Sequence, residues 1–194
     1  MKTNIILAGV GGQGILTIAA VLDTAALESG LNLKQSEVHG MSQRGGAVQS
    51  HVRISDTEIH SDLIPQGKAD IIISVEPMEA LRYLPFLKKD GYLVTDSNPF
   101  ENIPDYPKME ELYNQIKLLP NNILIDAKKI AKDLGNSKAT NIVILGAASS
   151  LLPLSEESLL QAIKSLFERK GERVVKKNIE AFNKGKEIAM EILS

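Results

Sequence analysis

The feature that most constrains this chain is a cluster of glycines that directly follows a short apolar run, residues 4–8. The cluster fits the pattern G-x-G-x-x-G, and apolar residues recur at helical spacing from about Gly12 onward. A buried strand that turns through glycines into a helix is the first half of a βαβ unit, and amides at the helix start attract anions. The predicted site consists of Gly9, Gly11, Gly12, Gln13 and Gly14; a tight turn without a ligand is the alternative.

Short apolar runs and helical patterns then alternate along the chain. Strands are predicted at 31–38, 70–75, 91–95 and 122–125, and helices at 76–87, 108–117, 127–134, 140–152, 156–169 and 172–193. This order indicates an α/β fold, a Rossmann-like and mostly parallel sheet with helices on both faces and a helical C-terminal third. Because no shift in composition marks a boundary, we expect a single domain over residues 1–194.

One segment interrupts this alternation. After the second strand the chain does not return into a helix but runs through a glycine-rich stretch into residues 47–54, where apolar and polar residues alternate. That pattern predicts a half-exposed strand with His51 and Arg53 on its polar side, and residues 58–63 as its partner strand. We therefore predict a β-hairpin insertion after the second strand, with His51 and His60 partly buried in it.

The glycine-rich stretch that enters this hairpin is the second candidate site. Arg44 offers five donors in a fixed geometry that suits carboxylate or phosphate, and Ser42 and Gln43 add neutral donors. Gly45 and Gly46 permit a nest of backbone amides. We predict that the stretch recognises an anion or a neighbouring protein surface; an ordinary polar entry to the hairpin is the alternative.

The glycine turn also fits a nicotinamide-dependent dehydrogenase or redox sensor. Such a site needs an acid near the end of the second strand for the ribose hydroxyls, and Glu37 is the candidate. The loop and hairpin that replace the next helix argue against this function, and a solvated carboxylate explains Glu37 equally well. No residue is assigned as catalytic, because the three histidines have neither zinc-site nor triad spacing.

The composition narrows the possible partners. A formal charge of −2 gives no broad electrostatic attraction to nucleic acid, which would require a basic face, so we expect no nucleic-acid partner. The chain has no cysteine, which excludes thiolate metal sites and iron–sulfur clusters ligated by this chain.

The N-terminus lacks a secretion-signal pattern, and the longest apolar stretch, 142–152, is shorter than the roughly 20 residues a bilayer needs. We expect a cytoplasmic chain without a membrane partner, and interpret 142–152 as a buried core helix.

Several stretches together closely resemble the small (beta) subunit of indolepyruvate:ferredoxin oxidoreductase, within the gamma-domain family of 2-oxoacid:ferredoxin oxidoreductases. The similarity covers nearly the whole chain, and its most specific part is Gly40-Met41-Ser42-Gln43-Arg44-Gly45-Gly46. The other similar stretches are 9–14, 47–53, 62–70 and 76–82.

The resemblance implies an oxidative decarboxylation of a 2-oxoacid to the acyl-coenzyme A, with electrons passed to ferredoxin. It implies a large partner subunit that holds thiamine diphosphate and iron–sulfur clusters, and a small subunit that serves the coenzyme A side and is inactive alone. Whether the glycine turn contacts coenzyme A or only the partner stays open. Indolepyruvate and related arylpyruvates are the implied substrates, with pyruvate, branched-chain 2-oxoacids and 2-oxoglutarate as alternatives. A purely structural partner domain is a further alternative.

Overall fold

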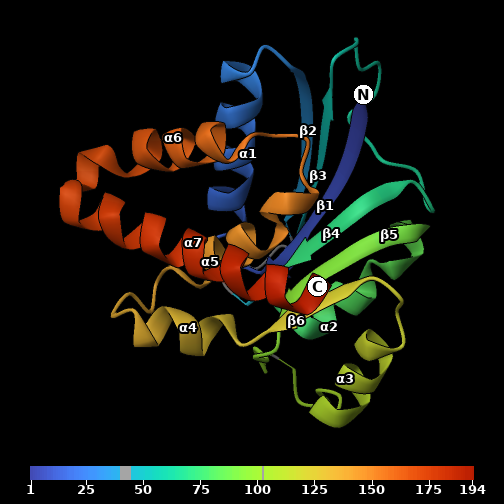
Figure 1. The fold of residues 1–194 in the computed structure, drawn as a ribbon. Helices are drawn as coiled ribbons and strands as arrows, with labels where there is room; N and C mark the ends of the chain where they lie inside the picture. Colours follow the sequence, from blue (N-terminus) through green and yellow to red (C-terminus); the bar gives the residue numbers. More distant parts are fainter. Residues whose placement is uncertain (40–44, 102) are drawn as a thin grey trace.

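The computed structural model describes residues 1–39, 45–101 and 103–194. Within these residues a six-stranded sheet crosses the molecule in the order β2-β3-β1-β4-β5-β6 (Figure 1). Its strands are β1 (Lys2–Val10), β2 (Asn32–His39), β3 (Ala47–Ser55), β4 (Ala69–Ser74), β5 (Leu87–Asp96) and β6 (Asn122–Ile125). The neighbours β1, β4, β5 and β6 pair in parallel, whereas β3 is antiparallel to both β2 and β1. The prediction of a mostly parallel sheet is therefore confirmed.

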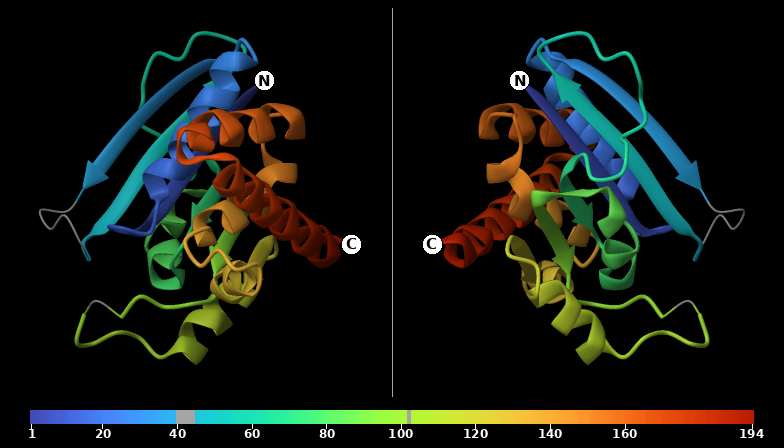
Figure 2. Two further views of the ribbon diagram at one scale, coloured as in Figure 1. Left: turned by 90° about the vertical axis from the view of Figure 1, so that its left-hand side faces the viewer. Right: turned by 90° about the vertical axis from the view of Figure 1, so that its right-hand side faces the viewer.

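Helices cover both faces of this sheet, as predicted. The helices are α1 (Ile15–Glu28), α2 (Pro77–Arg82), α3 (Met109–Lys117), α4 (Ala127–Asp133), α5 (Thr140–Ala148), α6 (Glu156–Phe167) and α7 (Glu172–Leu193), with short 3-10 turns at Leu84–Phe86, Ser149–Leu151 and Glu168–Lys170. Figures 1 and 2 show α6 and α7, orange to red, on one side of the sheet and α2 and α3 on the other. The helical C-terminal third is thus confirmed, and it covers the sheet face that α1 also covers.

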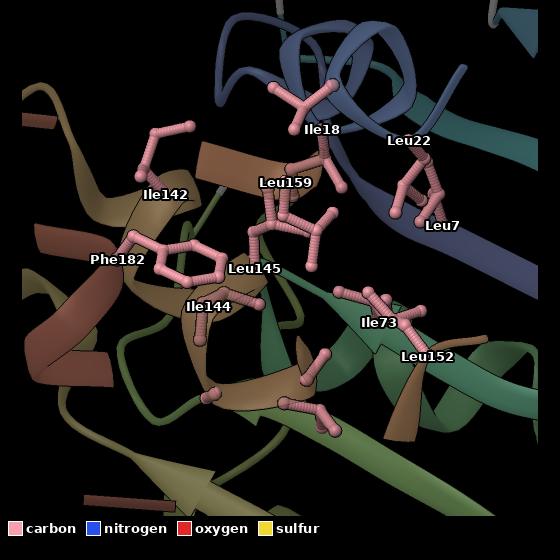
Figure 3. Packing of buried hydrophobic residues seen from close by; sticks show 14 of the residues in the cluster. Leu7, Ile18, Leu22, Ile73, Ile142, Ile144, Leu145, Leu152, Leu159 and Phe182 are labelled. Carbon is pink, nitrogen blue, oxygen red and sulfur yellow. The ribbon is translucent and has the colours of Figure 1, made fainter. Parts of the chain in front are cut away.

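The larger hydrophobic core lies between the sheet and the C-terminal helices. Its centre is α5, which is buried from Asn141 to Ala148 and packs on β4 and β5. In Figure 3, Leu145 of α5 lies among Ile18 of α1, Leu159 of α6 and Phe182 of α7. A helix that is apolar on every side must be covered on every side, which confirms the interpretation of 142–152 as a core segment.

Two glycines allow α5 and α7 to cross closely. A Cβ added at Gly146 would lie 2.0 Å from the carbonyl oxygen of Phe182, and one added at Gly185 would lie 2.0 Å from that of Val143. Both neighbours are main-chain atoms, which cannot rotate away as a side chain does. Each helix therefore contributes one glycine that the other helix's backbone rests against.

The hairpin differs from the prediction in its partner strand. The strand β3 pairs with β2 on one side and with β1 on the other, while residues 58–63 form no strand. The polar side of β3 is also not exposed: His51 is 4% and Arg53 7% exposed. The prediction of a half-exposed strand paired with 58–63 was therefore wrong, and so was a strand position for His60, which is exposed.

The reason for this burial is a segment without regular structure that crosses the outer face of β3. The amide of Ile64 donates to Nδ1 of His51 at 3.0 Å, and the ring of Phe86 meets the imidazole edge-on with centroids 5.4 Å apart. Nη1 of Arg53 donates to the carbonyl oxygens of Ser61 and Leu63. Polar side chains can line a buried face when main-chain groups satisfy them, which an alternating sequence pattern does not reveal.

Candidate functional site

The candidate site is a cleft of about 500 Å³ at the carboxyl ends of the parallel strands. Helix α1 leaves β1 toward one face of the sheet and α2 leaves β4 toward the other. Neighbouring strands whose connections diverge in this way form the crevice in which α/β proteins bind ligands. The cleft is lined by Gly12, Gln13, Val75, Asp96, Asn98, Pro99, Phe100, Lys128, Ser137, Lys138 and Thr140.

The side chain of Gln13 fills the inside of the glycine turn. Its Oε1 accepts a hydrogen bond from the amide of Val10 at 2.7 Å, and its Nε2 donates to the carbonyl of Val75 at 3.4 Å. Gln13 therefore joins the end of β1 to the end of β4 and shapes the wall of the cleft. Gln13 lines the cleft, but much of its hydrogen-bonding capacity serves the fold, and its contact with a ligand stays a prediction.

Packing explains two of the predicted glycines. A Cβ at Gly9 would lie 2.6 Å from Cγ2 of Val75, and one at Gly14 would lie 2.5 Å from Nδ2 of Asn141, which donates to the Gly14 carbonyl. Gly14 also has φ +85°, a conformation that glycine tolerates best. Gly12, at φ +99°, has no atom within 4 Å of its added Cβ and lines the cleft. The tight-turn alternative thus accounts for all three glycines, through packing at Gly9 and Gly14 and through positive φ at Gly12 and Gly14, and a ligand contact by Gly12 stays a prediction.

The amino terminus of α1 gives this end of the cleft a positive character. No side chain caps the helix, and its first turn contains no acidic residue. The first amides of a helix carry partial positive charge and need acceptors. An anion in the cleft would supply them, as the sequence pattern predicts.

The second candidate segment meets the glycine turn at its carboxyl end. The amide of Gly11 donates to the carbonyl of Gly46 at 2.9 Å, and Gly45, with φ +79°, makes the turn into β3. Ser42, Gln43 and Arg44 lie outside the described residues. The structure therefore brings one end of the glycine-rich stretch onto the glycine turn, and an anion contact by Arg44 stays a prediction.

Residues that the sequence did not single out form the opposite side of the cleft. Lys128 comes from the start of α4, Lys138 from the loop before α5, and Asp96 from the end of β5. A polar residue directly after a buried parallel strand is a recognisable signal, and it points to Asp96. The two lysines belong to no motif, and only the folded chain brings them beside Gly12.

Asp96 belongs to a short polar network at the floor of the cleft. It is 3% exposed and accepts hydrogen bonds from Nδ2 of Asn98 and from the amide of Ala127, each at 3.0 Å. Burial raises the pKa of the Asp96 carboxyl, although both hydrogen bonds oppose that shift. Asn98 also donates to Asp126, the residue that caps α4. The network fixes the start of α4, which carries Lys128.

A buried glutamate holds the loop that forms another wall of the cleft. Glu76 is fully buried and accepts from the amides of Glu79 (2.7 Å) and Phe100 (3.3 Å) and from the hydroxyl of Tyr106. Burial raises the pKa of Tyr106, and the hydrogen bond to Glu76 raises it further. Glu76 thus secures two points of the loop that contributes Asn98 and Phe100 to the cleft.

Glu37 does not lie where a dinucleotide site needs it. It is on β2, which β3 separates from β1, so its carboxylate is not beside the glycine turn as a ribose-binding acid would be. It accepts from Nε2 of Gln35 and lies close enough to Asp23 of α1 to influence that carboxyl. The candidate role for Glu37 in nicotinamide binding is therefore not supported by the fold.

Asp23 is expected to make the stability of the chain depend on pH. Burial and the Glu37 charge raise its pKa from 3.8 to about 6, and its Oδ1 is buried without a hydrogen-bond partner among the described residues. The pKa of Asp23 is higher in the folded chain than in the unfolded chain. The contribution of this carboxyl to the free energy of unfolding is therefore fully present below about pH 4 and is lost as pH rises through about 6. Asp23→Asn should then stabilise the chain by about 1–2 kcal/mol near pH 7.5, discounted for partial exposure, and hardly at all near pH 4.

Urea unfolding at the two pH values measures this effect. Asp133→Asn on the exposed side of α4 removes the same charge and is the matched control. An equal gain from both variants at neutral pH would show that net charge, and not burial of Asp23, is responsible.

Comparisons with known proteins agree with this fold and identify the family to which the chain belongs. The family model described as pyruvate ferredoxin/flavodoxin oxidoreductase matches residues 4–188. Indolepyruvate oxidoreductase subunit IorB of Pyrococcus horikoshii is 40% identical, over 98% of each chain. A keto/oxoacid ferredoxin oxidoreductase gamma subunit from Geobacter sulfurreducens superposes with a TM-score of 0.71 at 28% identity, covering 97% of this chain and 99% of that one.

A second solved structure shares the fold within a longer chain. The 2-oxoglutarate:ferredoxin oxidoreductase of Magnetococcus marinus, solved with 2-oxoglutarate, coenzyme A and succinyl-CoA bound, superposes with a TM-score of 0.78 at 24% identity. The match covers 98% of this chain but 31% of that one, so this fold is one part of the longer polypeptide. In the described part of this chain, no helix combines the length and apolar character needed to cross a membrane.

Proposed function

Because the chain belongs to the pyruvate ferredoxin/flavodoxin oxidoreductase family and is the small subunit of a 2-oxoacid:ferredoxin oxidoreductase, we propose that its enzyme acts on indolepyruvate. The reaction is oxidative decarboxylation to the acyl-coenzyme A, with the electrons passed to ferredoxin. The observation that carries this proposal is the 40% identity, over nearly all of both chains, to a subunit named for indolepyruvate. Relatives named for 2-oxoglutarate, the KorC subunits of 2-oxoglutarate synthase, are less similar, at 31% and 32% identity over 99% and 98% of this chain.

The role proposed for this chain is to hold the nucleotide end of coenzyme A. Coenzyme A carries a diphosphate and a 3′-phosphate, and the cleft offers the uncapped start of α1 together with Lys128 and Lys138. Asp96 also lines the cleft, but its carboxylate already accepts hydrogen bonds from Asn98 and from the amide of Ala127. The residues present therefore fit an anionic ligand.

This arrangement assigns binding and orientation, not bond-making, to the described residues of this chain. When bound, coenzyme A supplies the thiol that accepts the acyl group. A nucleotide end fixed by α1 and the two lysines makes attack by that thiol effectively intramolecular. Thiamine diphosphate and iron–sulfur clusters are assigned to a large partner subunit, in keeping with the absence of cysteine here.

Reconstitution with the large subunit tests the proposal. The isolated chain should show no activity, and the complex should reduce ferredoxin or a viologen dye when given both indolepyruvate and coenzyme A. A panel that includes pyruvate, a branched-chain 2-oxoacid and 2-oxoglutarate should show the highest kcat/KM for indolepyruvate. Turnover by the isolated chain, or a preference for another member of the panel, would contradict the assignment.

The KM for coenzyme A, measured in the same reconstituted complex, tests the role of the cleft. The double variant Lys128→Gln, Lys138→Gln should raise the KM for coenzyme A by about tenfold or more, because each lysine is expected to contribute a charge-assisted contact. The KM for indolepyruvate should stay unchanged. Lys132→Gln, exposed on α4, is the matched control. An unchanged KM for coenzyme A together with weaker assembly would instead support a purely structural subunit.

A further inference from the structure

A second cleft lies at the other end of the parallel strands, where β1, β4 and β5 begin. Its volume is about 390 Å³. Lys2 from the start of β1, Lys68 and Asp70 around the start of β4, and Lys88 from the start of β5 line it. Because it lies at the amino ends of these strands, it is separate from the candidate site at their carboxyl ends.

A buried arginine forms part of the wall of this cleft. Arg53 is 7% exposed and lines the cleft from β3. Its Nε donates to Oδ1 of Asn4 at 3.0 Å, and its Nη1 donates to two main-chain carbonyls, those of Ser61 and Leu63. All three acceptors are neutral. In the described part of the chain Nη2 has no partner and no carboxylate pairs with Arg53.

The absence of a counter-ion at Arg53 is informative. A guanidinium stays charged at every physiological pH, and burying a charge without an opposite one is costly. Hydrogen bonds to neutral carbonyls offset only part of that cost. Because Arg53 lines the cleft, a ligand bound there can supply the acceptor that Nη2 lacks among the described residues.

The rest of the lining increases this positive charge. Lys2, Lys68 and Lys88 accompany Arg53, against Asp70 as the single carboxylate of the lining. Asp70 is already engaged, because Lys88 Nζ contacts its Oδ1 at 2.8 Å and the amide of Asn4 donates to its Oδ2 at 2.7 Å. Lys88 also contacts Oδ2 of Asp90 at 3.6 Å, so the cations of the lining that no carboxylate pairs within the described residues are Lys2, Lys68 and Arg53.

We propose that this second cleft binds a phosphate group, either free phosphate or the terminal phosphate of a small ester. A phosphate dianion matches the surplus of positive charge better than a carboxylate does, and its several oxygens suit an arginine fork flanked by lysines. The volume exceeds what one phosphate occupies, so an ester with a small organic group also fits. The ligand completes the hydrogen bonding of Arg53.

The test is an NMR titration of the full-length, ¹⁵N-labelled chain. Sodium phosphate and glycerol 3-phosphate are the two probes, each added at constant ionic strength against sodium chloride. Saturable shifts are expected at Nε of Arg53 and at the amides of Gly67 and Lys68. The probe with the lower Kd identifies whether free phosphate or the ester is the preferred form.

The test uses lysine variants and not a variant of Arg53, because Arg53 donates hydrogen bonds to the carbonyls of Ser61 and Leu63 and its loss would disturb the fold. Lys68→Gln with Lys88→Gln should raise the Kd by about tenfold or more, whereas Lys89→Gln, the exposed neighbour of Lys88, should not change it. The variant Lys128→Gln, Lys138→Gln, which alters the first cleft, should leave these shifts intact. The proposal is overturned if neither probe exceeds chloride, if the shifts survive the Lys68 and Lys88 substitutions, or if they vanish with Lys128 and Lys138.

Discussion

Gly146→Ala is expected to unfold most of the protein under conditions in which the parent chain is fully folded. The new methyl carbon would lie 2.0 Å from the carbonyl oxygen of Phe182. Relief requires the backbone of α7 to move away from α5, which opens the core on which Leu145 and Phe182 pack. A cost above about 4 kcal/mol follows from overpacking against rigid backbone and from the cavity it creates. That is a large part of the roughly 5–15 kcal/mol by which a typical domain is stable.

Urea or thermal unfolding followed by far-UV circular dichroism measures this loss. Gly185→Ala should behave in the same way, because its methyl group would meet the carbonyl of Val143 from the other side of the crossing. The double variant should cost less than the sum of the two, since one displacement of α7 relieves both contacts. Asn183→Ala, exposed on α7, is the control and should shift stability by less than about 1 kcal/mol. A normal unfolding midpoint for Gly146→Ala would show that the two helices can separate at little cost.

The elements predicted correctly from sequence are those whose signal is local. The four-residue strand β6 and the long helix α7 have the predicted bounds, because an apolar run between turn residues and an uninterrupted helical period each define an element without outside information. The glycine pattern located the turn between β1 and α1 for the same reason. The sheet order was not available in this way, since pairing is decided between segments distant in sequence.

The strand β3 shows what a periodic pattern omits. Alternation correctly indicates which side chains share a face, but exposure depends on what lies over that face. Here residues near Ile64 cover it and satisfy His51 and Arg53 with an amide and two carbonyls. Because those partners are main-chain atoms, no complementary residue type marks them in the sequence.

The candidate site was partly predictable for a related reason. Gly12 and Gln13 line the cleft as the motif indicates, yet Lys128 and Lys138 are far away in sequence and carry no pattern. Their place is set by Asp96 and Asn98, which secure the start of α4, and by the docking of α5. A sequence motif therefore locates site residues that belong to one turn of the backbone, such as Gly12 and Gln13. It does not locate residues that reach the same cleft from distant segments, such as Lys128 and Lys138.

Removing the carboxylate of Glu76 is the second substitution with a large expected effect, on both stability and ligand binding. In Glu76→Ala the amides of Glu79 and Phe100 and the hydroxyl of Tyr106 lose their acceptor, the first in a buried position and the other two in partly buried positions. An unsatisfied buried donor costs about 1–3 kcal/mol and a partly buried one less, so a total of about 3–5 kcal/mol is expected. Tyr106→Phe removes one of these bonds and should cost about 1 kcal/mol.

Comparison of Glu76→Gln with Glu76→Ala separates the effect on stability from the effect on coenzyme A binding. Glu76→Gln keeps an acceptor oxygen and should recover much of the stability in urea unfolding. Variants that stay folded should raise the KM for coenzyme A in the reconstituted complex, because the loop carrying Asn98 and Phe100 no longer has fixed contacts beside the cleft. Hydrogen exchange at the Phe100 amide should rise in the same order, least in Glu76→Gln and most in Glu76→Ala. If exchange rises while the KM for coenzyme A does not, the loop contributes to the fold but not to the site, and the ligand must be held by α1 and the two lysines alone.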